Sequence, residues 1–415
     1  MRLMRTAPVP SARSGPGRAV MAAVVAGTIG WIGVIWIGLQ LAAGSASSLG
    51  FDLDLLVRAG QDVAAGRSPY DPALLAGNAP LATSLFYSYP PPVAQAFSLI
   101  SSVPSRAILV VWDLGAVLGF LVVTELLRRR VAPDRGWREV LLVALACAPL
   151  TLPFAVGLLF GNLDVWFPFL YGAMLLAVVA PGPRTAVSAG AALAAASLKL
   201  HPASMGAWFL ARALRERRGA DPGSPGLVVV SAAVVAASVV ALSVLAGGGG
   251  VWAEYADVVR AGAGASIVDP RNAGIAAQLA AVGGGDDLAR SMHVVIGIGA
   301  VLLTVWAAWR RADPVESFAW ATAASLATLP VTWYHYPSAL MPIAVVAILR
   351  APSQDARRVS VLVTAGAVVA AAALVWLPLL WVAVGLIVAA ARASAAAPSP
   401  VVPPLPAEAP VRAAG

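Results

Sequence analysis

The sequence contains little charge and almost no cysteine. Asp, Glu, Lys and Arg make up 12% of its 415 residues, whereas 60% of the residues are hydrophobic. Soluble domains carry about twice this charged fraction, and no water-soluble core can bury so much apolar surface, so lipid must surround most of the chain. The single cysteine, Cys147, cannot form an intrachain disulfide. We therefore predict an all-α, polytopic membrane protein.

Several motifs with well-understood chemistry are also missing. The chain has no HExxH, CxxC, Walker A or GxSxG pattern, so zinc hydrolysis, nucleotide hydrolysis and serine catalysis lack support. It also lacks the internal repeat of a transporter built from two halves. Its net charge of +8 comes from short arginine clusters between apolar runs, as at 128–130 and 215–218. This is the positive-inside pattern of membrane proteins and argues against nucleic-acid binding.

Apolar stretches of about 20 residues predict the membrane spans, and the arginines between them predict their direction. We expect a bundle of about 12 transmembrane helices within residues 19–392. A cytoplasmic segment (1–18) precedes it and a disordered Pro/Ala-rich tail (393–415) follows, with both termini cytoplasmic. The first apolar run is too long for the hydrophobic region of a cleaved signal peptide, the alternative interpretation, and suits an uncleaved anchor. The expected spans lie near 19–43, 106–127, 138–154, 164–180, 185–199, 203–214, 226–246, 290–309, 315–331, 336–350, 358–373 and 375–391.

Two extracytoplasmic loops, about 44–105 and 247–289, are long enough to be structured. The first contains an amphipathic segment, 51–65, that suits a helix lying along the membrane surface. It also contains 93–103, an apolar stretch too short to span the membrane. The second opens with four glycines and holds another interfacial stretch. We expect these loops to carry the functional residues.

Ionisable residues cluster on the predicted outer side. Asp52 and Asp54 follow the first span, Lys199 and His201 interrupt an apolar run, and His335 lies between two late spans. Such residues are costly at membrane depth and indicate function. The alternatives are solvated carboxylates, a lysine that extends to the interface and a histidine of the aromatic belt. A carboxylate here could accept a proton from a hydroxyl, an ammonium could bind a phosphate, and a histidine could do either.

Aromatic and polar residues complete this outer set. Interfacial Tyr and Trp are common anchors, so each is weak evidence by itself. The cytoplasmic side offers mainly arginine, and this asymmetry favours an enzyme that acts at the outer face. The further substrate-binding candidates are Tyr70, Tyr89, Asn162, Glu254 and Trp333, and the other polar members are Gly161, Asp164, Tyr255 and Asn272.

An ordered series of motifs between about residues 20 and 350 resembles glycosyltransferase family 87, the polyprenol-phosphate-sugar-dependent α-mannosyl- and arabinofuranosyltransferases. In the family pattern an Asp follows the first span and a helix ends in G-x-x-P-Y-D. Aromatic-Y-P-P, K-x-x-P and W-x-H elements come later. The sequence departs from the pattern at Leu56 and Val57, where the family has one or two tyrosines, and at Asn162, where it has Gln. The matching positions are Asp52, 59–60, 66–71, 89–91, 103–104, 109–112, 199–202 and 333–335.

The resemblance implies a GT-C-type bundle with catalytic extracytoplasmic loops in the plasma membrane. It implies inverting transfer of a sugar, mannose first and arabinofuranose second, from a polyprenyl-phosphate donor to a hydroxyl of an envelope lipid or glycan. By this resemblance Asp52 is the general base, with Asp54 as the alternative. Lys199, with His201, binds the lipid phosphate, and His335 serves in either role.

The resemblance also makes Glu254 a ligand of sugar hydroxyls. We expect no metal and no cofactor besides the donor, because a phosphate leaving group carries its own charge and positioning with electrostatics can suffice. The rival interpretation is a transporter or flippase of lipid-linked sugars, which would place polar residues on both faces and at mid-membrane. A second rival, an assembly partner in envelope synthesis, would not need the Asp, Lys and His set.

Overall fold

The computed structural model describes residues 49–76, 86–138, 151–200, 202–216, 224–267 and 269–395, together with the isolated residue 32. Every regular element in these ranges is helical, as the sequence predicts. The elements are α2 (Phe51–Ala64), α3 (Pro72–Leu75), α4 (Pro91–Ser98), α5 (Ser105–Val131), α7 (Thr151–Phe160), η2 (Leu163–Trp166), α8 (Phe167–Val179), α9 (Pro183–Ala196), η3 (Ser197–Lys199), α10 (Ala203–Glu216), α11 (Ser224–Gly247), α12 (Gly250–Ser266), α13 (Ile275–Leu279), η4 (Ala280–Gly284), α14 (Asp286–Arg310), α15 (Pro314–Ser325), η5 (Tyr336–Leu340), α16 (Met341–Arg350), α17 (Ala356–Ala372) and α18 (Leu379–Ala393).

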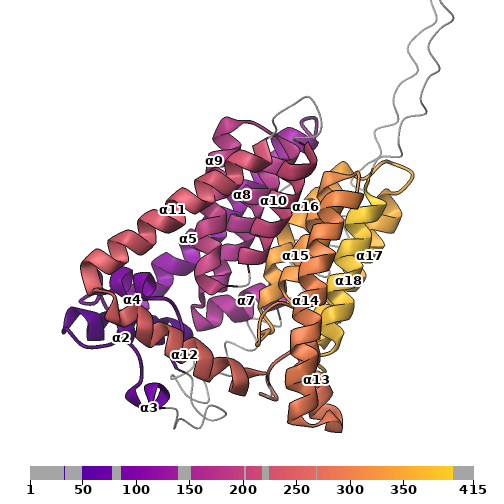
Figure 1. The fold of residues 1–415 in the computed structure, drawn as a ribbon. Coiled ribbons are helices and arrows are strands. Elements are labelled where there is room, and N and C mark those ends of the chain that lie inside the picture. Colours follow the sequence, from indigo (N-terminus) through magenta and orange to yellow (C-terminus); the bar gives the residue numbers. More distant parts are fainter. Residues whose placement is uncertain are drawn as a thin grey trace, which may run out of the picture.

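The long helices lie side by side, and short helices gather at one end of them (Figure 1). We call this end, formed by α2, α3, α4 and α12, the site end. There α2 packs on α4, and α12 packs on α3. The helix α12 follows the end of α11 and crosses the site end toward α13 (Figure 1). The two segments predicted to be structured loops, 44–105 and 247–289, thus supply helices to the same end of the bundle.

Among the described residues, three helices are long and apolar enough to cross a membrane, namely α5, α11 and α14. Their outward side chains are apolar: Val111, Leu242 and Leu302 are each more than 60% exposed. Apolar surface of this extent is typical of a protein in contact with lipid. The described part of the chain also contains shorter apolar helices, at Leu163–Val179, Ile275–Gly284, Tyr336–Arg350 and Leu379–Ala393.

The described helices do not confirm the predicted count of about 12 spans. The expected span at 19–43, apart from residue 32, and most of the span at 138–154 lie outside the described residues, as do segment 1–18 and the tail from 396. The remaining predicted spans coincide with helices, although several of these helices are shorter than a membrane crossing requires. The structure therefore supports a helical membrane protein.

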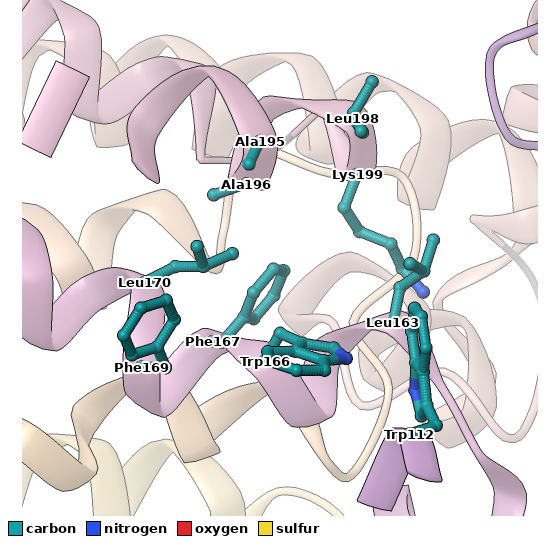
Figure 2. Close-up of a pocket in the computed structure, with 10 residues that line it drawn as sticks. All are labelled: Trp112, Leu163, Trp166, Phe167, Phe169, Leu170, Ala195, Ala196, Leu198 and Lys199. Atoms are coloured by element: carbon teal, nitrogen blue, oxygen red, sulfur yellow. The ribbon is translucent and has the colours of Figure 1, made fainter. Parts of the chain in front are cut away.

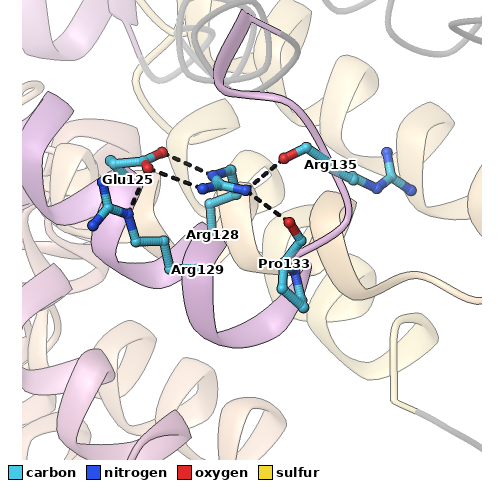
Figure 3. Close-up of polar contacts among 5 residues, drawn as sticks. All are labelled: Glu125, Arg128, Arg129, Pro133 and Arg135. Atoms are coloured by element: carbon cyan, nitrogen blue, oxygen red, sulfur yellow. Dashed lines mark hydrogen bonds and ion pairs between the residues drawn. The ribbon is translucent and has the colours of Figure 1, made fainter.

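The end of α5 away from the site end carries an arginine cluster around one glutamate (Figure 3). Arg128 donates to both carboxylate oxygens of Glu125, at 2.8 and 3.0 Å, and Arg129 donates to Oε1 at 2.7 Å. The Arg128 guanidinium also donates to the Pro133 carbonyl at 3.1 Å. Glu125 is thus paired with two arginines of its own helix. Positive charge in the last turn also complements the helix dipole.

A second ion-pair network ties α15, α16 and α18 together. Arg350 donates to both oxygens of Asp313, each at 2.8 Å, and to Ser394 Oγ at 2.9 Å. Asp313 also caps α15 by accepting from the Glu316 amide at 2.7 Å. Bidentate Arg–carboxylate pairs are among the stronger polar contacts in proteins. This network therefore fixes the helix ends remote from the site end.

The centre of the bundle is packed with aromatic and small residues. Trp208 meets Phe318 edge to face at a centroid distance of 5.4 Å, and its indole donates to Ser317 Oγ at 2.9 Å. A Cβ at Gly190 would lie 2.5 Å from Ser231 Cβ, so α9 and α11 approach as closely as glycine permits. Small residues at such crossings are the usual means of close helix packing in membranes. The packed bundle gives the site end a rigid base.

Candidate active site

The predicted helix at 51–65 is present as α2, and Asp52 lies in its first turn. Leu53 and Leu56 are fully buried beneath it. A Cβ at Gly60 would come within 2.6 Å of the Phe97 backbone, so α2 lies directly on α4. This packing fixes the position and direction of the Asp52 side chain.

Asn162 connects Asp52 to the rest of the site. The preceding Gly161 has a φ of 65°, which glycine adopts without strain. The Asn162 side chain is buried and donates through Nδ2 to Asp52 Oδ2 at 2.6 Å. Its Oδ1 accepts from Lys199 Nζ at 3.0 Å and from the Asp164 amide at 3.1 Å. One amide thus joins a carboxylate from α2 to a cation from η3.

Lys199 is the cation of the site, and its side chain is only 10% exposed. Its ammonium donates to Tyr89 Oη at 2.8 Å and lies 4.8 Å from the centre of that ring and 5.3 Å from that of Tyr336. Cation–π contacts of this kind stabilise an ammonium held away from water. The next residue, Leu200, has a φ of 65°, which leucine rarely adopts. Such backbone strain is concentrated at functional sites.

Asp164 places a buried negative charge beside Lys199. Its side chain is 1% exposed, and Oδ2 lies 3.3 Å from Lys199 Nζ and 2.9 Å from His335 Nε2. The His335 side chain is itself only 8% exposed and precedes η5. Charges removed from water are tolerated in proteins when they are paired. The site therefore contains two carboxylates in different surroundings, Asp52 on a neutral amide and Asp164 between two basic groups.

A group of tyrosines supports the Lys199 ammonium from the side of α4. The Tyr70 hydroxyl donates to the Tyr89 carbonyl at 3.0 Å, and the Tyr87 hydroxyl donates to the Pro90 carbonyl at 3.2 Å. Burial raises the pKa of Tyr89 to about 12. Tyr89 is therefore a neutral phenol at physiological pH. Because its oxygen accepts from Lys199, its own hydrogen remains available to a ligand.

An apolar pocket of about 230 Å³ ends at Lys199 (Figure 2). Lys199 and Trp112 lie at one end of it, and Phe169 and Leu170 lie at the other (Figure 2). The indole of Trp112 donates to the Asn162 carbonyl at 3.3 Å, so one wall of the pocket is tied to the polar cluster. The pocket can take an apolar chain whose head reaches the ammonium. Its full lining is Trp112, Leu163, Trp166, Phe167, Phe169, Leu170, Ala195, Ala196, Leu198 and Lys199.

Three of the predicted site residues that the structure describes make their described contacts outside this cluster. Asp54 lies in the first turn of α2, and its carbonyl accepts from Arg58 Nε at 3.2 Å. Glu254 accepts from Ser68 Oγ at 2.6 Å and so links α12 to the loop before α3. The ring of Trp333 lies 5.8 Å from the Arg271 guanidinium. His201 falls outside the described residues.

Sequence analysis assigned no role to Asp164, although it placed this residue among the outer polar set. The structure makes it the link between Lys199 and His335. The sequence feature that could have indicated a role for Asp164 is the short polar interruption 161–164 between two apolar runs, which also contains Asn162. Trp112 and Trp166 were also missed as pocket residues because both lie in apolar runs, where tryptophan is ordinary.

Comparison with known families decides the class of protein. The model of glycosyltransferase family 87 matches residues 87–332, which is more than half of the chain. The chain belongs to glycosyltransferase family 87. No curated protein and no solved structure gave a significant match. The family match contains Tyr89, Asn162 and Lys199, and the fold brings Asp52 and His335 to them from outside the matched range.

As a member of glycosyltransferase family 87, the protein is a membrane glycosyltransferase. The reaction requires a group that accepts the proton of the attacking hydroxyl and groups that stabilise the leaving group. The cluster offers one of each kind. Asp52 is a half-buried carboxylate with one oxygen held by Asn162, and Lys199 is a cation at the mouth of an apolar pocket.

Proposed function

We propose that the protein transfers a sugar from a polyprenyl-phosphate donor to an acceptor hydroxyl, with inversion, at the extracytoplasmic surface of the plasma membrane. The observation that carries the proposal is the junction of Asp52, Asn162 and Lys199 beside an apolar pocket. A lipid-linked donor has an apolar chain, one phosphate and one sugar. The pocket, the ammonium and the carboxylate suit these three parts in that order.

In this mechanism Lys199 binds the donor phosphate and Tyr89 adds a hydroxyl donor. The Lys199 ammonium already has hydrogen-bond partners in Tyr89 and Asn162, so its position is set before the donor arrives. The prenyl chain lies along the aromatic wall that includes Trp112 and Trp166. Pre-oriented charge of this kind stabilises a leaving phosphate without reorganisation during the reaction.

Asp52 is the general base. The acceptor oxygen attacks the anomeric carbon from the face opposite the phosphate, and its proton passes to Asp52. The bond between the anomeric carbon and the phosphate oxygen breaks, and its electron pair stays on polyprenyl phosphate, which gains one negative charge. Asp52 loses one negative charge in the same step, so the net charge of the site is conserved. Lys199 and His335 remain to stabilise the phosphate.

The proposal requires no metal and no cofactor besides the donor, because positioning and fixed charges supply the stabilisation. Loss of transfer in chelator with recovery on addition of magnesium would overturn this part. We propose mannose as the first sugar to test and arabinofuranose as the second. The acceptor is a lipid or glycan of the cell envelope. Both termini are cytoplasmic in this arrangement. The arginine cluster of Figure 3, and Arg350 with its partner Asp313, then face the cytoplasm.

The alternative is a transporter or flippase of lipid-linked sugars. The Asp52–Asn162–Lys199 junction favours the enzyme. A displacement reaction needs a carboxylate close to the cation that binds the leaving phosphate, and Asp52 lies close to Lys199 in this way. Transport of the donor without release of polyprenyl phosphate would favour the alternative.

The decisive experiment compares wild type, Asp52→Asn and Asp54→Asn in membranes at equal protein level. Each is given radiolabelled polyprenyl-phosphate mannose or, separately, its arabinose analogue, with a native lipid-glycan extract. We expect transfer by wild type and Asp54→Asn and its loss in Asp52→Asn, because only Asp52 contacts Asn162. Equal transfer by Asp52→Asn would remove Asp52 from the mechanism. No transfer by wild type from either donor would contradict the proposed donor class.

A further inference from the structure

Asp164 is the most buried ionisable side chain of the cluster. Its carboxylate, 1% exposed, contacts two basic groups that come from distant parts of the chain, Lys199 Nζ at 3.3 Å and His335 Nε2 at 2.9 Å. We infer that Asp164 is a positioning residue, which holds Lys199 and His335 side by side so that both act on one phosphate. This inference rests on the proposed function, because that function supplies the phosphate.

The contact with Asp164 determines how the His335 ring is used. Nε2 is fully buried in this contact, 2.9 Å from Asp164 Oδ2, and the ring meets that of Tyr336 edge to face at a centroid distance of 5.3 Å. The carboxylate and the Tyr336 ring together hold the imidazole beside Lys199. Because Nε2 is enclosed, it is not exposed to the acceptor hydroxyl.

The two carboxylates of the site consequently have separate tasks. Asp52 contacts the neutral amide of Asn162 and keeps a second oxygen that this contact does not use. Asp164 is enclosed and faces Lys199 and His335. A base needs access to its substrate and a lone pair that no cation occupies, which Asp52 has. Asp164 instead acts on the reaction only through the two basic side chains that it orients.

The turn at 161–164 holds the backbone of Asp164 in place. It lies in η2 immediately after the turn at Gly161, and its own amide donates to Asn162 Oδ1 at 3.1 Å. The same Asn162 oxygen accepts from Lys199. The backbone of Asp164 and the ammonium that it attracts are thus anchored to one atom. A shift of the 161–164 turn would move the phosphate-binding groups and the base together.

A double-mutant cycle tests the inference with the purified full-length protein in lipid nanodiscs. Asp164→Asn, His335→Gln and the double variant are compared for kcat and for the donor KM. We expect each single substitution to lower kcat by about 10- to 100-fold, the range expected when a buried charged group loses one partner. The double variant should then have about the same kcat as the less active of the two single variants, because the effects of substituting residues that act as a unit do not add. Fully additive losses, or an Asp164→Asn variant with wild-type kcat, would overturn the inference.

Glu316→Gln supplies the matched control. Glu316 is also a buried carboxylate, 7% exposed, and it contacts Arg311 at 3.4 Å far from the cluster. Its removal tests the general cost of losing a buried acid. We expect lower thermal stability without loss of kcat and without coupling to His335→Gln.

A spectroscopic measurement separates this inference from the proposed function. The chain has only three histidines, so the ¹⁵N resonances of His335 can be assigned by comparison with His335→Gln. We expect the His335 resonances to shift in Asp164→Asn and to keep their wild-type positions in Glu316→Gln. Unchanged His335 resonances in Asp164→Asn would refute the positioning role even if transfer is observed. Shifted His335 resonances in a protein that transfers neither sugar would preserve the positioning role and reject the proposed function.

Discussion

Replacement of Gly161 by alanine should disturb the site through α2, and Gly66→Ala is the matched control. Both glycines have a left-handed φ, 65° and 73° respectively, at which a Cβ costs about 1–2 kcal/mol. A Cβ at Gly66 would meet no atom within 4 Å. A Cβ at Gly161 would lie 2.7 Å from Leu53 Cβ and 2.8 Å from Leu109 Cδ1. Leu53 follows Asp52 directly, so relief of this overlap should move Asp52, the proposed general base.

The two substitutions therefore differ in their packing cost and share their backbone cost. Overpacking adds about 1–3 kcal/mol, so we expect the free energy of unfolding to fall by about 2–5 kcal/mol in Gly161→Ala and by about 1–2 kcal/mol in Gly66→Ala. A displacement of about 1 Å at Asp52 would also lower kcat by about 100-fold in Gly161→Ala.

Thermal unfolding of both variants in the same lipid, and sugar transfer well below the unfolding temperature, would test this reasoning. Gly66→Ala should retain nearly wild-type kcat, because its Cβ enters open space. Equal stability and equal kcat of the two variants would refute the link from Gly161 to α2. A loss of stability in Gly161→Ala without a loss of kcat would show that the overlap is relieved without displacing Asp52.

Three further predictions concern the pocket, the phenol and the remote ion pairs. Trp166→Ala should raise the donor KM by about 10-fold for a long-chain donor and less for a donor with two isoprene units, because it removes one pocket wall; equal effects on both donors would contradict the pocket assignment. Burial raises the pKa of Tyr89 from 10.0 to about 12, so the unfolded chain loses this proton first and the free energy of unfolding should fall as the pH rises from 10 to 12. Unfolding measured across that window should show a shallower fall in Tyr89→Phe. Arg350→Met leaves Asp313 without its bidentate partner and should cost about 3 kcal/mol of stability while kcat stays unchanged, as thermal unfolding and transfer assays can show.

The sequence predicted which side chains meet better than it predicted how they meet. Asp52, Lys199 and His335 stood out because ionisable residues beside apolar runs are costly, and the structure brings all three into one cluster. The pairing partner of Lys199 and His335 was not predictable. Asn162 and Asp164 lie two residues apart in a short 3₁₀ turn, where no hydrophobic period indicates which side chain faces which neighbour.

Glu254 shows a second limit of prediction from sequence. It belongs to an amphipathic stretch that the sequence assigned to the interface, and that stretch is α12. The position of α12 over the loop before α3 depends on tertiary packing, in which Tyr255 stacks near Tyr70 at 6.2 Å. Because of this packing, the Ser68 hydroxyl donates a hydrogen bond to the Glu254 carboxylate. The proposed role of Glu254 as a ligand of sugar hydroxyls therefore requires the Ser68 contact to open.

The polar residues of the cluster share one structural feature, a position at a break between helices. In lipid a helix satisfies its own backbone, so a charged side chain in mid-helix has few partners besides other side chains. A helix end provides free amides, turns and close backbone approach, and these can hold a charge in place. Asp52, Asn162 and Lys199 each adjoin such a break, and left-handed φ values mark it at Gly50, Gly161 and Leu200. Because each break belongs to a different part of the bundle, packing of the whole fold is required to bring Asp52 and Lys199 together. Helix-packing substitutions far from the cluster should therefore lower kcat wherever they move one break relative to the others.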